Sequence, residues 1–333
     1  MSWKNTKQTS LADALAVEHK ALKELDDVQM LVNWNRIEQL LCDVHSNKKG
    51  EKAWPPLMMF KAMLLQSWYN LSDPQLEKQL ARDLLFRRFI GLSLSETVPD
   101  HSTLWRFRNN PKIVALQETL LNEINDQLAE KSLFIKTGSI SIVDASVIKA
   151  QRNRPNKDKN GNNTQDPEAG YNAKVASDGK LKTTYGYKAH VNVDEDGFVK
   201  AMEMTAGNVH DSQVFTTLLG GNEAAVYADS AYASGATDDW LDDKKIDNGV
   251  LSRAYRNKPL TDAQKQRNKM LSKIRYIIER FFGISKLHYG MAQARYLGLA
   301  RNKMRVAMLC MANNMKRGVS LQKEIDRLHE GYA

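Results

Sequence analysis

The sequence predicts an α+β or α/β fold, with a mixed-sheet domain between an all-helical N-terminal domain and C-terminal helices. Apolar residues recur at helical spacing through the first 135 residues. From about residue 139 they form short alternating runs, which are typical of strands, with a hairpin signal between two of the runs. Helical periodicity then returns to the end of the chain. A strand meander followed by alternating helices and strands is the order of an RNase H-like fold.

The helical region divides into an N-terminal arm, residues 1–50, and a domain at residues 51–135. The arm should be helical over residues 10–46 and is a candidate dimerisation element, and a polar linker at residues 47–52 follows it. Ser72 and Gln75 have the spacing of a capping box. A second short helix should begin near Asp100 and carry Arg106 and Arg108. Two short helices around a turn fit a helix-turn-helix that binds DNA, and equally a plain bundle whose arginines face solvent.

The RNase H-like domain is expected at residues 136–290, and a C-terminal helical extension at residues 291–333. The predicted strands are residues 139–144, 185–193, 198–204, 225–229 and 249–251. The predicted helices are residues 211–219, 233–244, 261–286 and 291–316. Residues 151–170 read as a polar loop, and the acidic residues 194–196 as a solvated hairpin tip. Asp211 is interpreted as a helix cap, and the Met304, Met308, Met311 and Met315 stripe as packing.

Composition excludes several classes of protein. The chain is 42% hydrophobic and 26% charged, which is typical of a soluble globular protein. No apolar run approaches the roughly 20 residues of a membrane helix, so we expect no membrane partner. The two cysteines, Cys42 and Cys310, have no metal-finger spacing. A reducing, cytoplasmic location is therefore expected.

The positive charge is concentrated near the C-terminus. The net charge is +9, and between Asp262 and Glu324 a single acidic residue, Glu279, stands among fourteen Lys and Arg. A solvated helical surface usually mixes both signs. This stretch therefore indicates a surface that faces the phosphates of a nucleic acid, and its lone carboxylate calls for an explanation.

Two aspartates, Asp144 and Asp229, end predicted strands. Aspartate is disfavoured in strands and in cores, so each needs a reason. Each by itself is explained well by capping of the turn that follows. Together they lie at the carboxyl ends of strands that could be neighbours, where open α/β sheets bind ligands. Carboxylates that converge there could hold two divalent cations for phosphoryl transfer.

Glu279 lies on a predicted amphipathic helix. The face expected to pack on the sheet carries Ile274, Ile277, Phe281 and Ile284. Glu279 should point away from that face, together with Arg275, Gly283 and Lys286. An exposed Glu279 paired with Arg275 is the alternative. Gly283 weakens the helix one turn beyond Glu279, and this favours a site where DNA or a metal comes close.

Several sequence blocks, taken in order, carry a family resemblance. The blocks are LLQSWYNLSDPQLEKQLARDLLFRRFIGL, VPDHSTLWRFRN, VDASVI, GYKAHVNVDEDGFV, TAGNVHDS, YADSAY, RYIIERFFGISK and ARYLGLARN. From about residue 55 to residue 302 the sequence resembles DDE transposases of bacterial insertion sequences, specifically the insertion-sequence-five group. Ser272 replaces a tyrosine frequent in that group, and Ala231 a glycine.

The resemblance implies a catalytic and metal-binding triad of Asp144, Asp229 and Glu279. Two Mg²⁺ per active site, with Mn²⁺ as a substitute, would support cleavage at the element's ends and joining of the 3′-OH ends to target DNA. The implied partners are double-stranded DNA, both terminal inverted repeats and target, and a second copy in a homodimer. The expected DNA contacts are Arg106, Arg108, Arg152, Arg154, Lys157, Lys188, Arg275, Lys286, Arg295 and Arg301. A DNA-binding regulator and a repair nuclease on the same fold are the alternatives.

Overall fold

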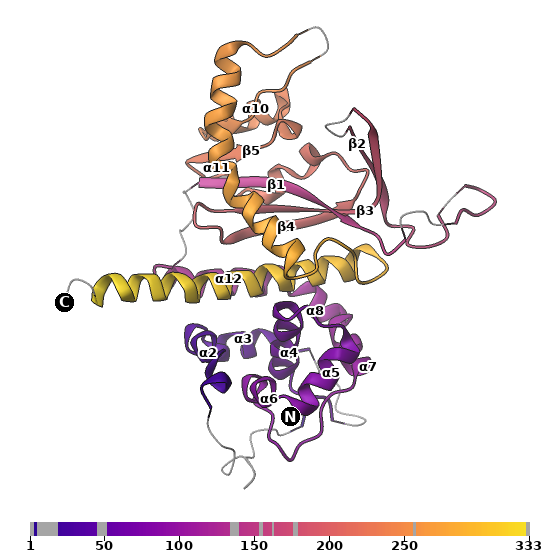
Figure 1. Cartoon of the computed structure of the whole chain (residues 1–333), viewed down its shortest axis with the longest axis vertical. Helices are drawn as coiled ribbons and strands as arrows, with labels where there is room; N and C mark the ends of the chain where they lie inside the picture. Colours follow the sequence, from indigo (N-terminus) through magenta and orange to yellow (C-terminus); the bar gives the residue numbers. More distant parts are fainter. Residues whose placement is uncertain are drawn as a thin grey trace. The chain divides into compact units, whose positions relative to one another are not determined.

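The chain forms two compact units, and each is described here by itself. The structure, a computed structural model, describes residues 3–4, 19–44, 52–133, 140–152, 156–161, 163–175, 179–255 and 258–330. One unit comprises Met1–Leu133 with Ala307–Ala333, and the other comprises Phe134–Val306. We call them the helical unit and the sheet unit (Figure 1). Within the described ranges, no helix has both the length and the apolar character needed to cross a membrane.

A six-stranded mixed sheet organises the sheet unit. Its strands are β1 (Ile140–Lys149), β2 (Gly170–Val175), β3 (Leu181–Val193), β4 (Val199–Ala206), β5 (Ala225–Ala228) and β6 (Asp247–Val250). The order is β2-β3-β1-β5-β6, and β4 also pairs with β3. Central β1 is antiparallel to β3 and parallel to β5, which is in turn parallel to β6. This arrangement confirms the predicted RNase H-like fold.

Helices and short 3-10 turns surround this sheet. They are η2 (Asp211–Val214), η3 (Thr216–Leu218), η4 (Ser230–Tyr232), α10 (Gly235–Asp243) and α11 (Asp262–Leu287). Helix α11 crosses the sheet against β1 and β5 (Figure 1). A buried cluster that includes Val143, Phe215, Val226 and Leu241 joins β1 and β5 to the turns and to α10. This core holds β1 and β5 in place next to Asp144 and Asp229.

Three predictions in this unit are wrong. Strand β1 continues through Asp144 to Lys149, because its second half pairs with β3 as far as Gly186. Strand β2 was not predicted; it begins at the last residue of the predicted loop and pairs with the first half of β3. The predicted helix at residues 211–219 is two 3-10 turns, η2 and η3. The β-branched pair Thr216 and Thr217 disfavours a longer helix there.

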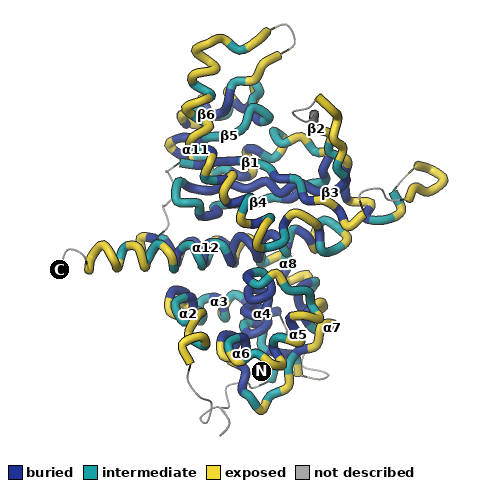
Figure 2. Tube along the Cα trace, viewed as in Figure 1, coloured by how far each residue is buried: buried dark blue, intermediate teal, exposed yellow. Residues whose placement is uncertain are grey.

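The described part of the helical unit contains short helices. They are η1 (Lys20–Lys23), α2 (Asp26–Leu31), α3 (Trp34–Leu41), α4 (Pro56–Trp68), α5 (Asp73–Arg82), α6 (Leu84–Ile90), α7 (His101–Arg108), α8 (Pro111–Ala115) and α9 (Gln117–Glu130). The Ser72–Gln75 capping box is present at α5, as predicted. The single helix predicted for residues 10–46 is broken within residues 19–44, where the Asn33 side chain caps α3; residues 10–18 and 45–46 lie outside the described ranges. Helix α4 is buried over most of its length (Figure 2).

The C-terminal helix α12 (Leu299–Glu330) begins in the sheet unit and completes the core of the helical unit. It begins later than predicted, because residues 292 and 294 form backbone hydrogen bonds with Lys149 at the end of β1. The Trp68 indole N–H donates to the Ala312 carbonyl at 2.9 Å. A Cβ at Gly318 would lie 2.7 Å from Leu128, so the two chain segments pack closely there. The methionine stripe is buried, which confirms packing as its role: Met304, Met308, Met311 and Met315.

The β3–β4 hairpin contains a buried acid. Asp194 is 0% exposed, so its predicted solvation is wrong. Its Oδ1 accepts from the backbone N–H groups of Asp196 (3.0 Å) and Phe198 (2.8 Å), and Gly197 supplies the positive φ of the turn. Its Oδ2 has no hydrogen-bond partner within the described part of the chain. Burial raises the pKa of Asp194 to about 6.

This raised pKa predicts a pH-dependent stability. The folded state holds the Asp194 proton more tightly than the unfolded state, so the stabilisation is complete below about pH 4 and is lost as the pH rises through about 6. Asp194→Asn stays neutral and should gain about 1–3 kcal/mol over the wild type between about pH 4 and pH 7. Urea unfolding across this range measures the difference. Asp239→Asn, at an exposed acid, is the control, and an equal gain there would contradict the explanation.

Candidate active site

The sheet register places Asp144 and Asp229 side by side. Parallel β1 and β5 pair from Ile140 with Ala225 to Val143 with Ala228. Asp144 is the next residue of β1, and Asp229 is the residue that follows β5. Neighbouring strands lie about 4.8 Å apart, and residues at the same level project from the same face. The backbone of two adjacent strands therefore brings both carboxylates together, as the sequence predicted, although Asp144 lies within β1 and not at its end.

Each carboxylate is also oriented by its own backbone. Asp144 Oδ1 accepts from the Ala145 N–H at 2.8 Å, and Asp229 Oδ1 accepts from the Ser230 N–H at 2.6 Å. Asp229 is the N-cap residue of η4. The capping alternative is thus correct for Asp229, and it does not exclude a place in a site. The Asp144 side chain is 18% exposed and that of Asp229 is 39% exposed.

Arg275 of α11 lies between the two carboxylates. Its Nη2 donates to Asp144 Oδ2 at 2.9 Å, and its Nη1 is 3.8 Å from Asp229 Oδ1. Burial raises the pKa of Asp144, the Arg275 charge opposes this effect, and the Asp229 charge adds to it. One guanidinium thus lies against two carboxylates and compensates their charge only in part.

The aspartate pair fits a divalent cation. Carboxylate oxygens are the hard ligands that Mg²⁺ and Mn²⁺ prefer, and a positively charged group already lies between these two carboxylates. Within the described residues, no three His, Cys, Asp or Glu side chains are gathered as a group that could hold a metal ion. The structure therefore brings together two members of the predicted triad, Asp144 and Asp229, and shows no contact between them and Glu279.

Glu279 is exposed on α11, beside the buried stripe of that helix. The predicted faces are correct for Phe281, which is buried, and wrong for Ile284, which is 38% exposed, and for Arg275, which is only 8% exposed. The buried residues of α11 are Arg275, Ile278, Phe281, Phe282 and Ser285. Hydrophobicity alone misassigned the face, because a polar residue that pairs with buried carboxylates belongs to it. Arg275 therefore faces the sheet, and no ion pair between Arg275 and Glu279 is among the described interactions.

A second polar cluster lies on β3 and η2. Lys188 Nζ is 2.8 Å from Asp211 Oδ1, and His190 Nε2 is 2.9 Å from Thr205 Oγ1. Burial lowers the pKa of His190 to about 4, so this imidazole is neutral at physiological pH. The cap of η2 is the His210 side chain, so the interpretation of Asp211 as a cap is wrong. Asp211 instead pairs with Lys188.

Sequence reasoning missed Tyr232 of η4. Its side chain is 0% exposed, and its hydroxyl has no hydrogen-bond partner among the described residues. Burial raises its pKa well above the usual range, and the charges of Asp211, Asp144 and Asp229 raise it further. The hydroxyl therefore lies within electrostatic reach of all three carboxylates. The only signal in the sequence was its position three residues after Asp229, in the YADSAY block.

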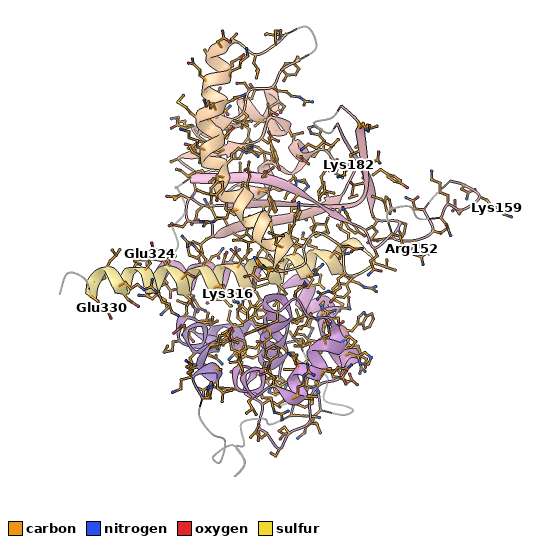
Figure 3. The ribbon with its side chains drawn as sticks, in the orientation of Figure 1. Arg152, Lys159, Lys182, Lys316, Glu324 and Glu330 are labelled. Atoms are coloured by element: carbon orange, nitrogen blue, oxygen red, sulfur yellow. The ribbon has the colours of Figure 1, made fainter. Side chains whose placement is uncertain are left out.

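The predicted DNA contacts fall into three groups. Arg106, Arg152, Lys157 and Arg301 are exposed, and Lys286 and Arg295 are partly exposed. Figure 3 shows Arg152 on the segment between β1 and β2, together with Lys159. Arg108, Lys188 and Arg275 are buried and are paired with Asp73, Asp211 and Asp144 respectively. These pairings count against a direct DNA contact by Arg108 and Lys188. Arg154 lies outside the described residues.

The Arg275–Asp144 pair predicts a measurable coupling. In a chelator, Arg275→Gln should lower the free energy of unfolding by about 2–4 kcal/mol, because the buried Asp144 carboxylate loses its counter-charge. The double variant with Asp144→Asn should recover most of this loss. Urea unfolding of the wild type, both single variants and the double variant measures the coupling. Additive effects would show that the pair contributes no stability.

Comparisons with known families cover both units. A family profile described as "Transposase DDE domain" matches residues 135–315, which is more than half of the chain. A second profile, "Transposase domain (DUF772)", matches residues 12–110. The first match contains Asp144, Asp229, Arg275 and Glu279, and the second contains most of the described helical unit.

Similar solved structures include two complexes of a transposase. The Mos1 strand transfer complex is 14% identical, with 86% of this chain and 84% of that chain covered and a TM-score of 0.20. The Mos1 mariner paired end complex with Mn is 12% identical, with 91% and 98% covered and a TM-score of 0.20. TM-scores this low show little overlap of the two backbones, and the RNase H-like fold is defined by the strand order of the sheet.

Proposed function

Because the chain belongs to the family of transposases with a DDE domain, we propose that Asp144, Asp229 and Glu279 form its catalytic site. A transposase is an enzyme that cuts and joins DNA. The observation that carries the proposal is the pairing of Asp144 and Asp229 across one guanidinium at neighbouring positions of parallel strands. Membership of the insertion-sequence-five group remains a prediction.

Helix geometry supports a place for Glu279 in this site. Asp144 Oδ2 is 2.9 Å from Arg275 of α11, and the Asp144 charge also acts on Lys286 of the same helix. Glu279 lies between these two residues in the sequence of α11, and at about 100° per residue it is only about 40° from Arg275 and about 20° from Lys286 around the helix axis. We infer that Glu279 would hold a divalent cation together with Asp144 and Asp229.

The proposed cofactor is Mg²⁺, two ions per site, with Mn²⁺ as a substitute. Asp144, Asp229 and Glu279 would hold it. When bound, it supplies Lewis-acid stabilisation and a more acidic water. Arg275 would pair with a DNA phosphate, as the sequence predicts for it. The Ala145 and Ser230 N–H groups hold the carboxylates of Asp144 and Asp229 in place.

Both chemical steps are phosphoryl transfers, so one site can serve both. In cleavage, a water oxygen attacks a phosphorus atom at the element's end, the bond to the 3′ oxygen breaks, and a 3′-OH is freed. In joining, this hydroxyl loses its proton and attacks a target phosphodiester, and the target's own 3′ oxygen leaves. The protein residues orient the reacting groups and neutralise the phosphates.

The proposed DNA surface uses exposed cations of the sheet unit. Arg152, Lys157 and Arg301 are exposed, and Lys286 is partly exposed on α11. Arg106 lies in the helical unit, which we propose binds the terminal inverted repeats. Transposon ends come in pairs, so we propose that a homodimer acts on two ends. Its DNA substrate implies a cytoplasmic location in a bacterial cell. The regulator alternative lacks support, because both strand aspartates are present and paired.

Substitution of the carboxylates tests the catalytic assignment. Asp144→Asn should reduce Mg²⁺-dependent cleavage at least about 1,000-fold, because a charged metal ligand is lost while the shape is kept. Glu279→Gln should cause a loss of the same order, and binding of an end duplex should stay within about 2-fold in both variants. Gel assays of nicking and of strand transfer from a pre-cut end measure these effects.

The matched control is Glu324→Gln, at the exposed acid of α12. It should cut at the wild-type rate. Wild-type cleavage by Glu279→Gln would remove this residue from the site, and cutting without joining by the wild type would favour the repair nuclease.

Gly283 predicts a conflict between stability and activity. A Cβ at this position meets no protein atom within 4 Å, so packing does not require glycine there. Gly283→Ala should therefore stabilise α11 by about 0.5–1 kcal/mol. If DNA approaches this face beside Glu279, the added methyl group should lower the cleavage rate. Thermal unfolding and cleavage assays measure the two effects.

Gly235→Ala, which also adds a methyl group into open space, is the control for Gly283→Ala. It should leave cleavage unchanged. Unchanged cleavage by Gly283→Ala would show that DNA does not come close to that face of α11.

A further inference from the structure

The helical unit contains a cavity with a positively charged lining. Its volume is about 350 Å³, and nine residues line it. Three of them, Lys4, Lys52 and Arg106, are cations, and none is a carboxylate. A cavity of this size lies within the range of ligand sites, which is roughly 300–1,000 Å³. The site is separate from the aspartate pair, which belongs to the sheet unit.

Three segments far apart in the sequence build this cavity. The Lys4 N–H donates to the Ala53 carbonyl at 2.8 Å, so the segment at residues 3–4 lies beside the segment that precedes α4. This backbone contact brings Lys4 next to Lys52 and Trp54. Helix α7 supplies the opposite part of the lining, which includes Arg106. The backbone contact between residues 3–4 and 53 thus brings Lys4 and Lys52 to the same cavity.

The cations are held by contacts that leave their charge unneutralised. Lys4 Nζ lies 4.1 Å from the centre of the Trp54 ring, and Arg106 donates to the Ser102 carbonyl (3.3 Å) and to Thr103 Oγ1 (3.2 Å). Within the described ranges, none of the three forms an ion pair with a carboxylate. The Arg106 charge contributes to lowering the pKa of Asp100, but the Asp100 carboxylate caps α7 and does not line the cavity.

We propose that this cavity binds one backbone phosphate, with its sugar, of the DNA end. The inference rests on the proposed function, which supplies the DNA. Lys4, Lys52 and Arg106 neutralise the phosphate, and the lining residues Thr103 and Asn110 offer a hydroxyl and an amide as further donors to its oxygens. The volume accepts a phosphate and a sugar but excludes a duplex. The site therefore fixes the register of α7 on the DNA and reads no base.

Neutral phosphates and charge-removing variants test the cavity together. An end duplex is prepared with a single methylphosphonate, an uncharged phosphate substitute, at each successive position. The wild type should lose affinity, about 3- to 10-fold, at one position above all. In Lys52→Gln/Arg106→Gln the affinity for unmodified DNA should fall about 10- to 100-fold, and the salt slope of log K should fall by about 2. Fluorescence anisotropy in a chelator measures both.

The coupling between the two changes is the decisive result. In the double variant, the methylphosphonate at the sensitive position should cost less than 2-fold, because the groups that meet the phosphate are already gone. Lys131→Gln, an exposed lysine of the same unit outside this cavity, should retain the full methylphosphonate effect. Absence of any position whose effect depends on Lys52 and Arg106 would overturn the proposal.

A second arm separates DNA from a free phosphate compound. Inorganic phosphate is titrated with the wild type and with the double variant, followed by ³¹P NMR. Saturable binding that needs Lys52 and Arg106, together with unchanged DNA affinity in the double variant, would overturn the proposal in favour of a free ligand. The proposed function fails separately, because a wild type that binds DNA through the cavity but does not cut it with Mg²⁺ would overturn only the catalytic assignment.

Discussion

The repulsion between two carboxylates on adjacent parallel strands governs the sheet unit. Asp144 and Asp229 cannot separate without a change of register between β1 and β5, and that register is fixed by buried residues such as Val143 and Val226. The backbone therefore holds two negative charges close together, and a positive charge must compensate. In this structure Arg275 provides it. Two carboxylates that the sheet holds close together attract cations, and metal-assisted phosphoryl transfer uses such a pair to bind its metal ions.

One buried side of helix α11 contributes both to the core and to the polar site. Ile278, Phe281 and Phe282 bury its inner side, and Arg275 extends that side into the polar site. Glu279 is exposed beside this buried stripe, while Asp144 and Asp229 each accept from a backbone N–H group. In the proposed site, the sheet therefore fixes two of the carboxylates, and the third lies on an exposed part of the helix.

The features that could be predicted from the sequence are those that depend on local residue patterns or on the family resemblance. The fold class, the capping box at Ser72 and the proximity of Asp144 to Asp229 could all be predicted. The second half of β1 could not, because its residues become a strand only through pairing with β3. The orientation of Arg275 was also missed, since hydrophobic periodicity treats arginine as an outward residue. The burial of Asp194 and Tyr232 depends on distant packing that no local pattern reveals.

Both ends of the chain contribute to the helical unit. Residues 307–330 place Ala312 against Trp68, and Gly318 lies against Leu128. During synthesis, the first 133 residues therefore emerge from the ribosome long before the segment that completes their core. The apolar surface of α4 that contacts α12 therefore stays uncovered until residues 307–330 have been synthesised. A fragment that ends before residue 307 would lack the contacts of α12 with Trp68 and Leu128, and the core of this unit would stay incomplete.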